Sequence, residues 1–269
     1  MFDDCGYYPR HVKASAELLA PNVAHYIYVS SISCYAKNDV EGANEDAELA
    51  KLEDPSVETM GAGYANYGGL KVQCEKAVQS TLPGRATIVR PGYIVGPDDP
   101  TGRFTYWPVR MDRGGDVLVP GEPSDPIQVI DVRDLSAWML LLGERGTKGV
   151  FNACGPAEPM SWMNVIEACR KSAGASSKVH WASVAELNSL GQDAEGFPIW
   201  APHEGDSKGF HTWSNARAVR AGLTFRSIAD IARDTLAWWK TLKDDDRRKQ
   251  LGGPAQDAEA RMLKSLKKI

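Results

Sequence analysis

The sequence lacks the features that mark several large classes of protein. No apolar run approaches the roughly 18 residues that a membrane-spanning helix needs. The N-terminus, MFDDCGYYPRHVK, has no basic region followed by an apolar core, so it does not read as a secretory signal. The net charge of −4 provides no bulk attraction for nucleic-acid phosphates. We therefore expect a cytoplasmic protein with no membrane and no nucleic-acid partner.

Cysteine and histidine are also sparse, with five of each. The cysteines stand singly along the chain, at Cys5, Cys34, Cys74, Cys154 and Cys169. No pair has the spacing of a zinc knuckle or a dithiol motif, and the histidines are equally dispersed. These residues predict free, partly buried thiols in a reducing compartment, and no metal site.

The first part of the chain alternates helix and strand patterns. Residues 12–20 carry apolar side chains at helical spacing, and Pro21 stops the run. Residues 25–30 form a β-branched and aromatic run that is typical of a buried strand. A polar loop at 37–59 precedes a second predicted helix at 64–80.

Three more strands and a capped helix are predicted further on. The strands are residues 86–90, 127–130 and 149–153. Asp131 stands at a helix N-cap position, and Asp134 follows three residues later. The alternation predicts an α/β fold with a mainly parallel sheet.

The C-terminal third reads as short helices in a smaller lobe. Serines at predicted N-caps are Ser161, Ser183, Ser214 and Ser227. Gly222 is predicted to end the helix that Ser214 begins. A charge run follows Lys243, which predicts a tail that is a loosely attached helix or disordered.

The strongest candidate for chemistry is Tyr67-Gly-Gly-Leu-Lys71 on the predicted 64–80 helix. A separation of four places the two side chains on one helical face. Tyrosine is a poor acid or base at neutral pH, and a nearby ammonium would lower its pKa. Alone the pair is a weak signal, because an exposed amphipathic helix often carries one by chance.

A second candidate lies where the first buried strand ends. Ser30 and Ser31 stand at its carboxyl end, the edge of an α/β sheet where ligands bind. The alternative role for Ser31 is a turn residue whose hydroxyl bonds its own backbone.

Three segments together resemble a known family. Tyr28-Val-Ser-Ser-Ile-Ser-Cys-Tyr35, Tyr67-Gly-x-x-Lys71 and Arg90-Pro-Gly-Tyr-Ile-Val-Gly-Pro97 are similar to the extended short-chain dehydrogenases/reductases, the NAD-dependent epimerase/dehydratase group. The resemblance extends from about Phe2 to Leu242 in the family's order. It implies a Rossmann-type sheet, a sugar-nucleotide substrate, NAD or NADP as cofactor, and it allows a homodimer.

The resemblance also implies roles for individual residues. Tyr67 would be the acid/base, Lys71 would bind the nicotinamide ribose, and Ser31 would bind the substrate oxygen. Pro91 and Gly92 would line the nicotinamide pocket. Further cofactor contacts would come from Cys5, Gly6 and Ser30. Tyr93 and Trp107, which bound a predicted loop, would contact substrate.

Two departures from the family stand out. Ile32 and Ser33 replace the Asp-Glu pair of the sugar dehydratases, which argues against 4,6-dehydration. The glycine-rich turn after the family's first strand is missing, since Gly61-Ala-Gly63 and Gly68-Gly69 do not follow a strand. We read the second pair as close helix packing. Phe2–Gly6 resembles the end of the family's fourth strand, so we expect a late start, a gene fragment or a shortened chain.

The sequence thus predicts a partial Rossmann-type parallel sheet with a smaller substrate-binding lobe. Its parts are an N-terminally incomplete core at 1–153, a lobe at 154–242 and a charged tail at 243–269. The predicted activity is NAD(P)-dependent hydride transfer of the epimerase or oxidoreductase type, with weak cofactor affinity if the chain acts alone. The alternative is a degenerate, non-catalytic binding or assembly module.

Overall fold

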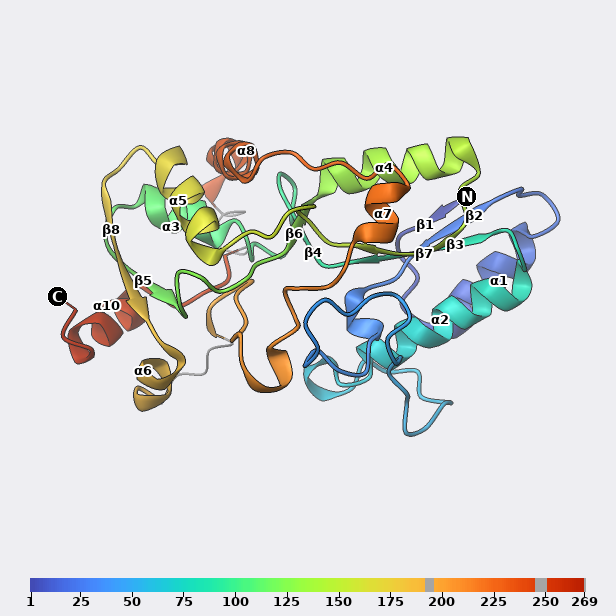
Figure 1. The fold of residues 1–269 in the computed structure, drawn as a ribbon, viewed down its shortest axis with the longest axis horizontal. Coiled ribbons are helices and arrows are strands. Elements are labelled where there is room, and N and C mark those ends of the chain that lie inside the picture. Colours follow the sequence, from blue (N-terminus) through green and yellow to red (C-terminus); the bar gives the residue numbers. More distant parts are fainter. Residues whose placement is uncertain (192–195, 245–250, 269) are drawn as a thin grey trace.

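The computed structural model describes residues 1–191, 196–244 and 251–268. Figure 1 shows an elongated α/β molecule with a parallel sheet toward each end, which confirms the predicted fold class. The strands are β1 (Phe2–Asp3), β2 (Tyr26–Val29), β3 (Ala86–Pro91), β4 (Tyr93–Val95), β5 (Gly115–Pro120), β6 (Val129–Asp131), β7 (Gly149–Ala153) and β8 (Ser177–Ala182).

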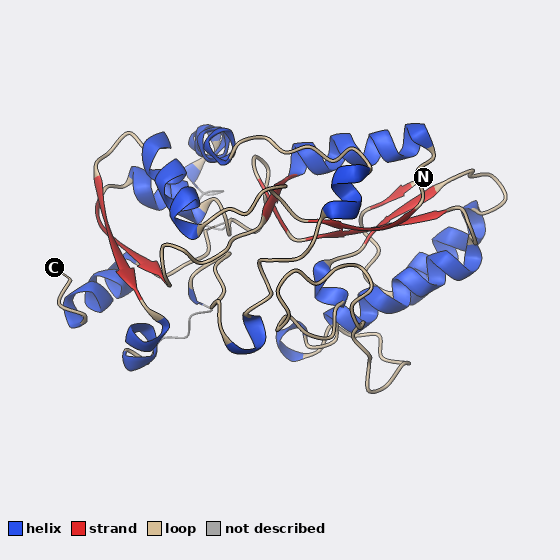
Figure 2. Ribbon diagram, in the orientation of Figure 1, coloured by secondary structure: helices blue, strands red, loops and turns tan. Residues whose placement is uncertain are grey.

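Helices connect and cover these strands (Figure 2). The α-helices are α1 (Pro9–Leu19), α2 (Tyr67–Thr81), α3 (Tyr106–Asp112), α4 (Val132–Arg145), α5 (Trp162–Ser172), α6 (Val184–Ser189), α7 (Ala216–Arg220), α8 (Ile228–Thr241) and α10 (Gln256–Ser265). Single 3₁₀ turns are η1 (Ile32–Cys34), η2 (Ala62–Tyr64) and η4 (Gly205–Ser207).

The main sheet has the order β1-β2-β3-β7, with every pair parallel. Helices α1 and α2 lie on one face and α4 on the other (Figure 1). Because both faces are covered, its strands are nearly continuous apolar runs, as in Tyr26–Val29. The carboxyl ends of β2 and β3 therefore meet at one edge of the sheet.

The second part of the molecule surrounds a parallel pair, β5 and β8. Neither strand was predicted, because each pairs with a partner about 60 positions away in the chain. Its core contains Trp107, Leu118 and Trp162, all fully buried. The segment from Phe104 to Val119 thus packs with the C-terminal lobe, although it precedes the predicted boundary at residue 153.

The second predicted helix begins three residues later than expected. Gly63 and Tyr64 have left-handed φ values of 58° and 63°, so they form a separate turn before α2 starts at Tyr67. The segment from Tyr93 to Trp107 was predicted to be a loop. It contains β4, which pairs with β6, and the first turn of α3.

The predicted helix caps are mostly confirmed. The hydroxyls of Ser161, Ser183 and Ser227 accept hydrogen bonds from the first turns of α5, α6 and α8. The prediction that Ser214 is an N-cap is wrong, because the N-cap of α7 is Asn215. The Asn215 amide instead donates to the carbonyl oxygens of Cys154 and Pro156, and so fixes the chain after β7.

The prediction of a loosely attached tail is wrong for residues 251–268. In α10 the Glu259 carboxylate is buried, bonds Arg110 Nε at 2.6 Å and accepts from the Leu118 N–H at 2.9 Å. Met262 and Leu263 complete the lobe core. Apart from Asp244, the charge run after Lys243 lies outside the described residues.

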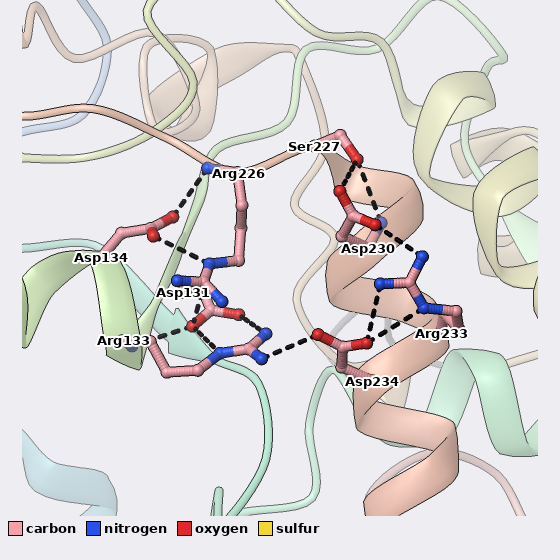
Figure 3. Close-up of polar contacts among 8 residues, drawn as sticks. All are labelled: Asp131, Arg133, Asp134, Arg226, Ser227, Asp230, Arg233 and Asp234. Atoms are coloured by element: carbon pink, nitrogen blue, oxygen red, sulfur yellow. Dashed lines mark hydrogen bonds and ion pairs between the residues drawn. The ribbon is translucent and has the colours of Figure 1, made fainter.

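An ion-pair network links the two parts of the molecule (Figure 3). Asp131 caps α4 as predicted and also bonds Arg133, whose Nη1 reaches Asp234 of α8 at 2.7 Å. Asp134 accepts from both the backbone N–H and Nε of Arg226, at 2.8 Å each. The network therefore holds α4, which covers the main sheet, against α8 of the second part.

Two further findings concern the cysteines and the lengths of the apolar helices. All five cysteines are free thiols, as predicted, and only Cys5 is exposed. Over the residues that the structure covers, we find no helix with the length and apolarity to cross a bilayer.

Candidate active site

A cavity of about 270 Å³ lies at the carboxyl ends of β2 and β3. Most of the predicted site residues line it, from β2, η1, α2 and the turn after β3. They are Ser30, Ser31, Tyr67, Lys71, Pro91, Gly92 and Tyr93. The parallel strands explain this convergence, because each delivers its following residues to the same edge.

The start of α2 is held unusually close to η1. A Cβ atom on Gly68 would lie 2.1 Å from the Ser33 carbonyl oxygen, and one on Gly69 would lie 2.6 Å from Leu52. This confirms that the two glycines serve close helix packing. Their lack of side chains allows α2 to bring Tyr67 next to Ser31.

Ser31 follows β2 in extended backbone and begins η1. Its hydroxyl oxygen accepts from the Ser33 N–H at 3.1 Å, which is the local turn role considered for it. Ser31 also lies close enough to Tyr67 to influence the pKa of its phenol. Ser31 and Tyr67 thus place two hydroxyls side by side on the cavity wall.

Tyr67 has a raised pKa, caused first by its burial. The neighbouring Ser31 side chain and the positive charge of Arg103 oppose this shift but do not outweigh it. The predicted lowering of the pKa by Lys71 is therefore not observed. Its physical reason is that the Lys71 ammonium is directed at backbone oxygens instead of at the phenol.

Lys71 is 3% exposed, and its Nζ donates to the carbonyl oxygens of Gly6 and Val29, at 2.9 and 2.7 Å. The same nitrogen lies 4.4 Å from the centre of the Tyr28 ring. Burial lowers the pKa of Lys71 to about 8. An ammonium has three donors, so one remains for a ligand hydroxyl in the cavity.

This pKa shift predicts a pH-dependent stability. Unfolded lysine keeps its proton up to its ordinary value of 10.5, whereas folded Lys71 releases it near pH 8. Between these values the unfolded chain binds more protons, so folding becomes more favourable as pH rises. From pH 7.5 to 10, the free energy of unfolding of the parent should gain about 2 kcal/mol relative to Lys71→Met. Urea unfolding at both pH values measures this difference, with Lys13→Met on the exposed side of α1 as the control. If the difference in unfolding free energy between the parent and Lys71→Met is the same at both pH values, the lowered pKa of Lys71 is contradicted.

Beneath the cavity lies a buried polar network that sequence reasoning missed. Arg90 binds both carboxylate oxygens of Glu75, through Nε at 2.9 Å and Nη2 at 2.6 Å. The Ser30 hydroxyl also donates to the Glu75 carboxylate, so this predicted site residue is part of the buried network. Arg90 Nη1 donates to the Tyr35 oxygen, and Tyr35 donates to Asn152 of β7. These bonds tie α2 to β2, β3 and β7.

Three residues predicted to contact a ligand do not line the cavity: Cys5, Gly6 and Trp107. Trp107 is fully buried in the lobe core, where its Nε1–H donates to the Pro198 carbonyl oxygen at 2.9 Å. It points inward because it lies in the first turn of α3, on the face that packs against α5. Cys5 is exposed and does not line the cavity. Its neighbour Gly6 acts through its carbonyl, which holds Lys71.

The lining residues that were not named as site residues include Asp4, Tyr7, Arg103 and Phe210. Tyr7 lies with its ring centre 6.5 Å from that of Tyr67. Phe210 comes from the C-terminal lobe and packs on Tyr93. No local motif marks these residues, because their position depends on contacts between distant segments. Within the described parts of the chain, no group of histidine, cysteine and acidic residues is placed to hold a metal ion.

No family model and no curated protein matches the sequence. Solved structures do match the fold. A UDP-glucuronic acid 4-epimerase from Bacillus cereus, in complex with NAD, has a TM-score of 0.58 at 15% identity, with 84% of this chain and 65% of that chain covered. A putative epimerase from Burkholderia cenocepacia has a TM-score of 0.58 at 18% identity, with 89% and 69% covered. A dTDP-4-dehydrorhamnose reductase from Bacillus anthracis, in complex with NADP, has a TM-score of 0.58 at 15% identity, with 87% and 72% covered.

These similarities define the class of fold. The chain has the α/β architecture of structures solved as sugar-nucleotide epimerases and reductases with NAD or NADP, and the predicted resemblance is confirmed at that level. At identities of 15–18% the similarity establishes fold alone. The chain spans about two thirds of the length of these neighbours, 65% in the Bacillus cereus epimerase.

Proposed function

We propose that this chain forms the catalytic and substrate-binding part of a cytoplasmic NAD(P)-dependent oxidoreductase or epimerase acting on a sugar nucleotide. One observation carries the proposal: Ser31, Tyr67 and Lys71 line a single cavity at the carboxyl edge of a parallel sheet. Proteins of the same fold have been crystallised with NAD and UDP-glucuronic acid, or with NADP.

The residues present fit the nicotinamide end of such a cofactor. Lys71 has one N–H left for a ribose hydroxyl, and Pro91 and Gly92 offer a flat wall beside it. We assign no described residue to the adenosine end. When bound, the cofactor would accept a hydride from an alcohol carbon and return it.

The proton is handled by the chain itself. Ser31 and Tyr67 line the same cavity, and in this proposal their two oxygens share a substrate hydroxyl. Tyr67 takes the hydroxyl proton as the carbonyl forms and gives it back in the reverse direction. Ser31 donates to the phenolate, and Arg103 supplies positive charge nearby, so both favour the ionised form of Tyr67.

The residues after Ser31 favour simple oxidation and reduction over sugar dehydration. Ile32 is buried among apolar side chains, and no carboxylate follows Ser31 in η1. Proton removal from a neighbouring carbon needs a second acid or base, and this turn supplies none.

Cofactor reduction tests the proposal. We expect the complete gene product, mixed with NAD⁺ or NADP⁺ and with UDP-glucose or UDP-glucuronic acid, to gain absorbance at the wavelength of the reduced nicotinamide. Ser31→Ala should slow that gain, because the substrate oxygen loses a hydrogen bond and its orientation. If no cofactor is reduced and no sugar epimer forms, the proposal is wrong and the binding-module alternative is favoured.

A further inference from the structure

The buried Glu75 carboxylate connects the three elements that carry the candidate active site. Its partner Ser30 directly precedes Ser31 at the end of β2. Its partner Arg90 directly precedes Pro91 at the end of β3. Glu75 itself belongs to α2. Each of the three elements is therefore bound to one carboxylate, and in both strands the bond is made by the residue next to a site residue.

On α2, Glu75 continues the row formed by Tyr67 and Lys71. The three positions are spaced by four residues, so the side chains follow one another along one face of the helix. Tyr67 and Lys71 line the cavity, whereas Glu75 does not and is only 2% exposed. The carboxylate thus lies behind the cavity wall, where it influences a ligand only through its neighbours.

The geometry around Glu75 requires a carboxylate. Its Oε1 accepts from both the Ser30 hydroxyl and Arg90 Nε, and its Oε2 accepts from Arg90 Nη2 at 2.6 Å. A glutamine has one oxygen and one NH₂ group at these two places, so one of its ends would point a donor at a donor of Arg90. Both partners of the ion pair are nearly inaccessible, and the mismatch would stay buried.

The charge of Glu75 also acts on Lys71. Burial lowers the pKa of Lys71 to about 8, and the charge of Glu75 is one of the influences that oppose this shift. Other titratable groups near Lys71 come from the N-terminal segment, β2, η1 and α2, and they are Asp3, Asp4, Tyr7, Tyr28, Cys34 and Cys74. Loss of the Glu75 charge should therefore lower the pKa of Lys71 further.

We propose that Glu75 is a positioning residue, which fixes the ends of β2 and β3 against α2 and so sets the geometry of the candidate active site. This inference rests on the proposed function, which assigns the substrate proton to Tyr67 and the cofactor ribose to Lys71. Glu75 contacts neither substrate nor cofactor. It contributes to turnover because it limits the relative movement of three elements whose side chains must act together.

Turnover of the complete gene product tests this role. We expect Glu75→Gln to lower kcat by about 10- to 100-fold and to change KM less, because the reacting groups are bound but misaligned. Ser30→Ala removes one hydrogen bond, leaves the ion pair intact and should lower kcat by about three- to tenfold. If Glu75→Gln does not fold, Ser30→Ala decides, and an unchanged kcat for Ser30→Ala then overturns the proposal.

A double variant separates positioning from stability. Arg90→Met with Glu75→Leu removes both buried charges, so most of the unfolding free energy should return. The connection between the strand ends and α2 stays broken, so kcat should remain at least about tenfold below that of the parent. Recovery of kcat together with stability would show a purely structural role and overturn the proposal.

The matched control is Glu259→Gln, which breaks the buried Arg110–Glu259 pair of the lobe core. The accessibility of this pair is similar to that of Arg90–Glu75, at 7% and 2% against 4% and 2% for the two side chains. Glu259→Gln should therefore lose comparable stability and keep its kcat. An equal loss of kcat in Glu259→Gln and Glu75→Gln would overturn the proposal.

A second measurement needs no turnover. Competitive labelling with acetic anhydride across a pH series, followed by mass spectrometry of the peptide that contains Lys71, measures the pKa of this amine. The labelling midpoint should move to lower pH in Glu75→Gln and stay in place in Glu259→Gln. An unchanged midpoint in Glu75→Gln overturns the proposal. A parent without turnover rejects the proposed function, and the midpoint then decides whether Glu75 acts on Lys71.

Discussion

Replacing Tyr67 with Phe should lower the turnover of the complete gene product by about 10²–10⁴-fold, the usual contribution of a positioned proton-transfer group. Phenylalanine keeps the ring and its packing beside Tyr7, and removes only the oxygen that faces Ser31. Cofactor affinity should stay nearly constant, since Lys71 and the Pro91-Gly92 wall are untouched.

The chain offers a matched control for this variant. Tyr64 lies three residues earlier, is 72% exposed and does not line the cavity. Tyr64→Phe should leave turnover unchanged. Because burial raises the pKa of Tyr67, alcohol oxidation by the parent should also accelerate as pH rises from neutrality, and Tyr67→Phe should lose that dependence. Equal rates for parent and Tyr67→Phe would remove the acid/base role and favour a non-catalytic binding module.

Breaking the buried Arg90–Glu75 pair should cost about 3–5 kcal/mol of unfolding free energy, the range measured when one partner of a buried ion pair is removed. Both side chains are nearly inaccessible, so Arg90→Met leaves the Glu75 carboxylate without a countercharge. Urea denaturation of the parent and of Arg90→Met measures the loss.

Two further variants distinguish the loss of this buried ion pair from the general effect of removing a charge on stability. Glu167→Gln breaks the exposed Arg170–Glu167 pair on α5 and should cost less than about 1 kcal/mol. The double variant Arg90→Met with Glu75→Leu removes both charges and should recover most of the stability. A loss for Arg90→Met as small as that for Glu167→Gln would show that the buried network contributes little.

Features that depend on local sequence were predicted well. Strand β2 and helix α1 follow from a β-branched run and from helical spacing ended by Pro21. The caps at Asp131 and Ser227 follow from short polar side chains placed before apolar stretches. The meeting of the site residues at one edge of the sheet could also be predicted, because parallel strands bring their carboxyl ends to the same edge.

Features that depend on contacts between distant segments could not be predicted from the sequence. The residues of β5 find their parallel partner in β8, about 60 positions later, a pairing that no local pattern encodes. Trp107 was assigned to the ligand from its place in a predicted loop, whereas packing against Trp162 directs it into the core. Arg103 and Phe210 meet at Tyr93 although they are far apart in the chain. The pKa of Tyr67 depends on burial, which spacing alone does not report.

The arrangement of the lobe core has a consequence for the order of events during synthesis. Residues 104–119 leave the ribosome early, but their partners Trp162, Met262 and Leu263 appear much later. The local pairs of the main sheet can form while translation continues, since β2, α2 and β3 follow one another directly. The lobe core closes only after α10 has emerged. A nascent chain stalled before residue 262 would therefore present a folded sheet beside an exposed apolar surface, the kind of species that chaperones recognise.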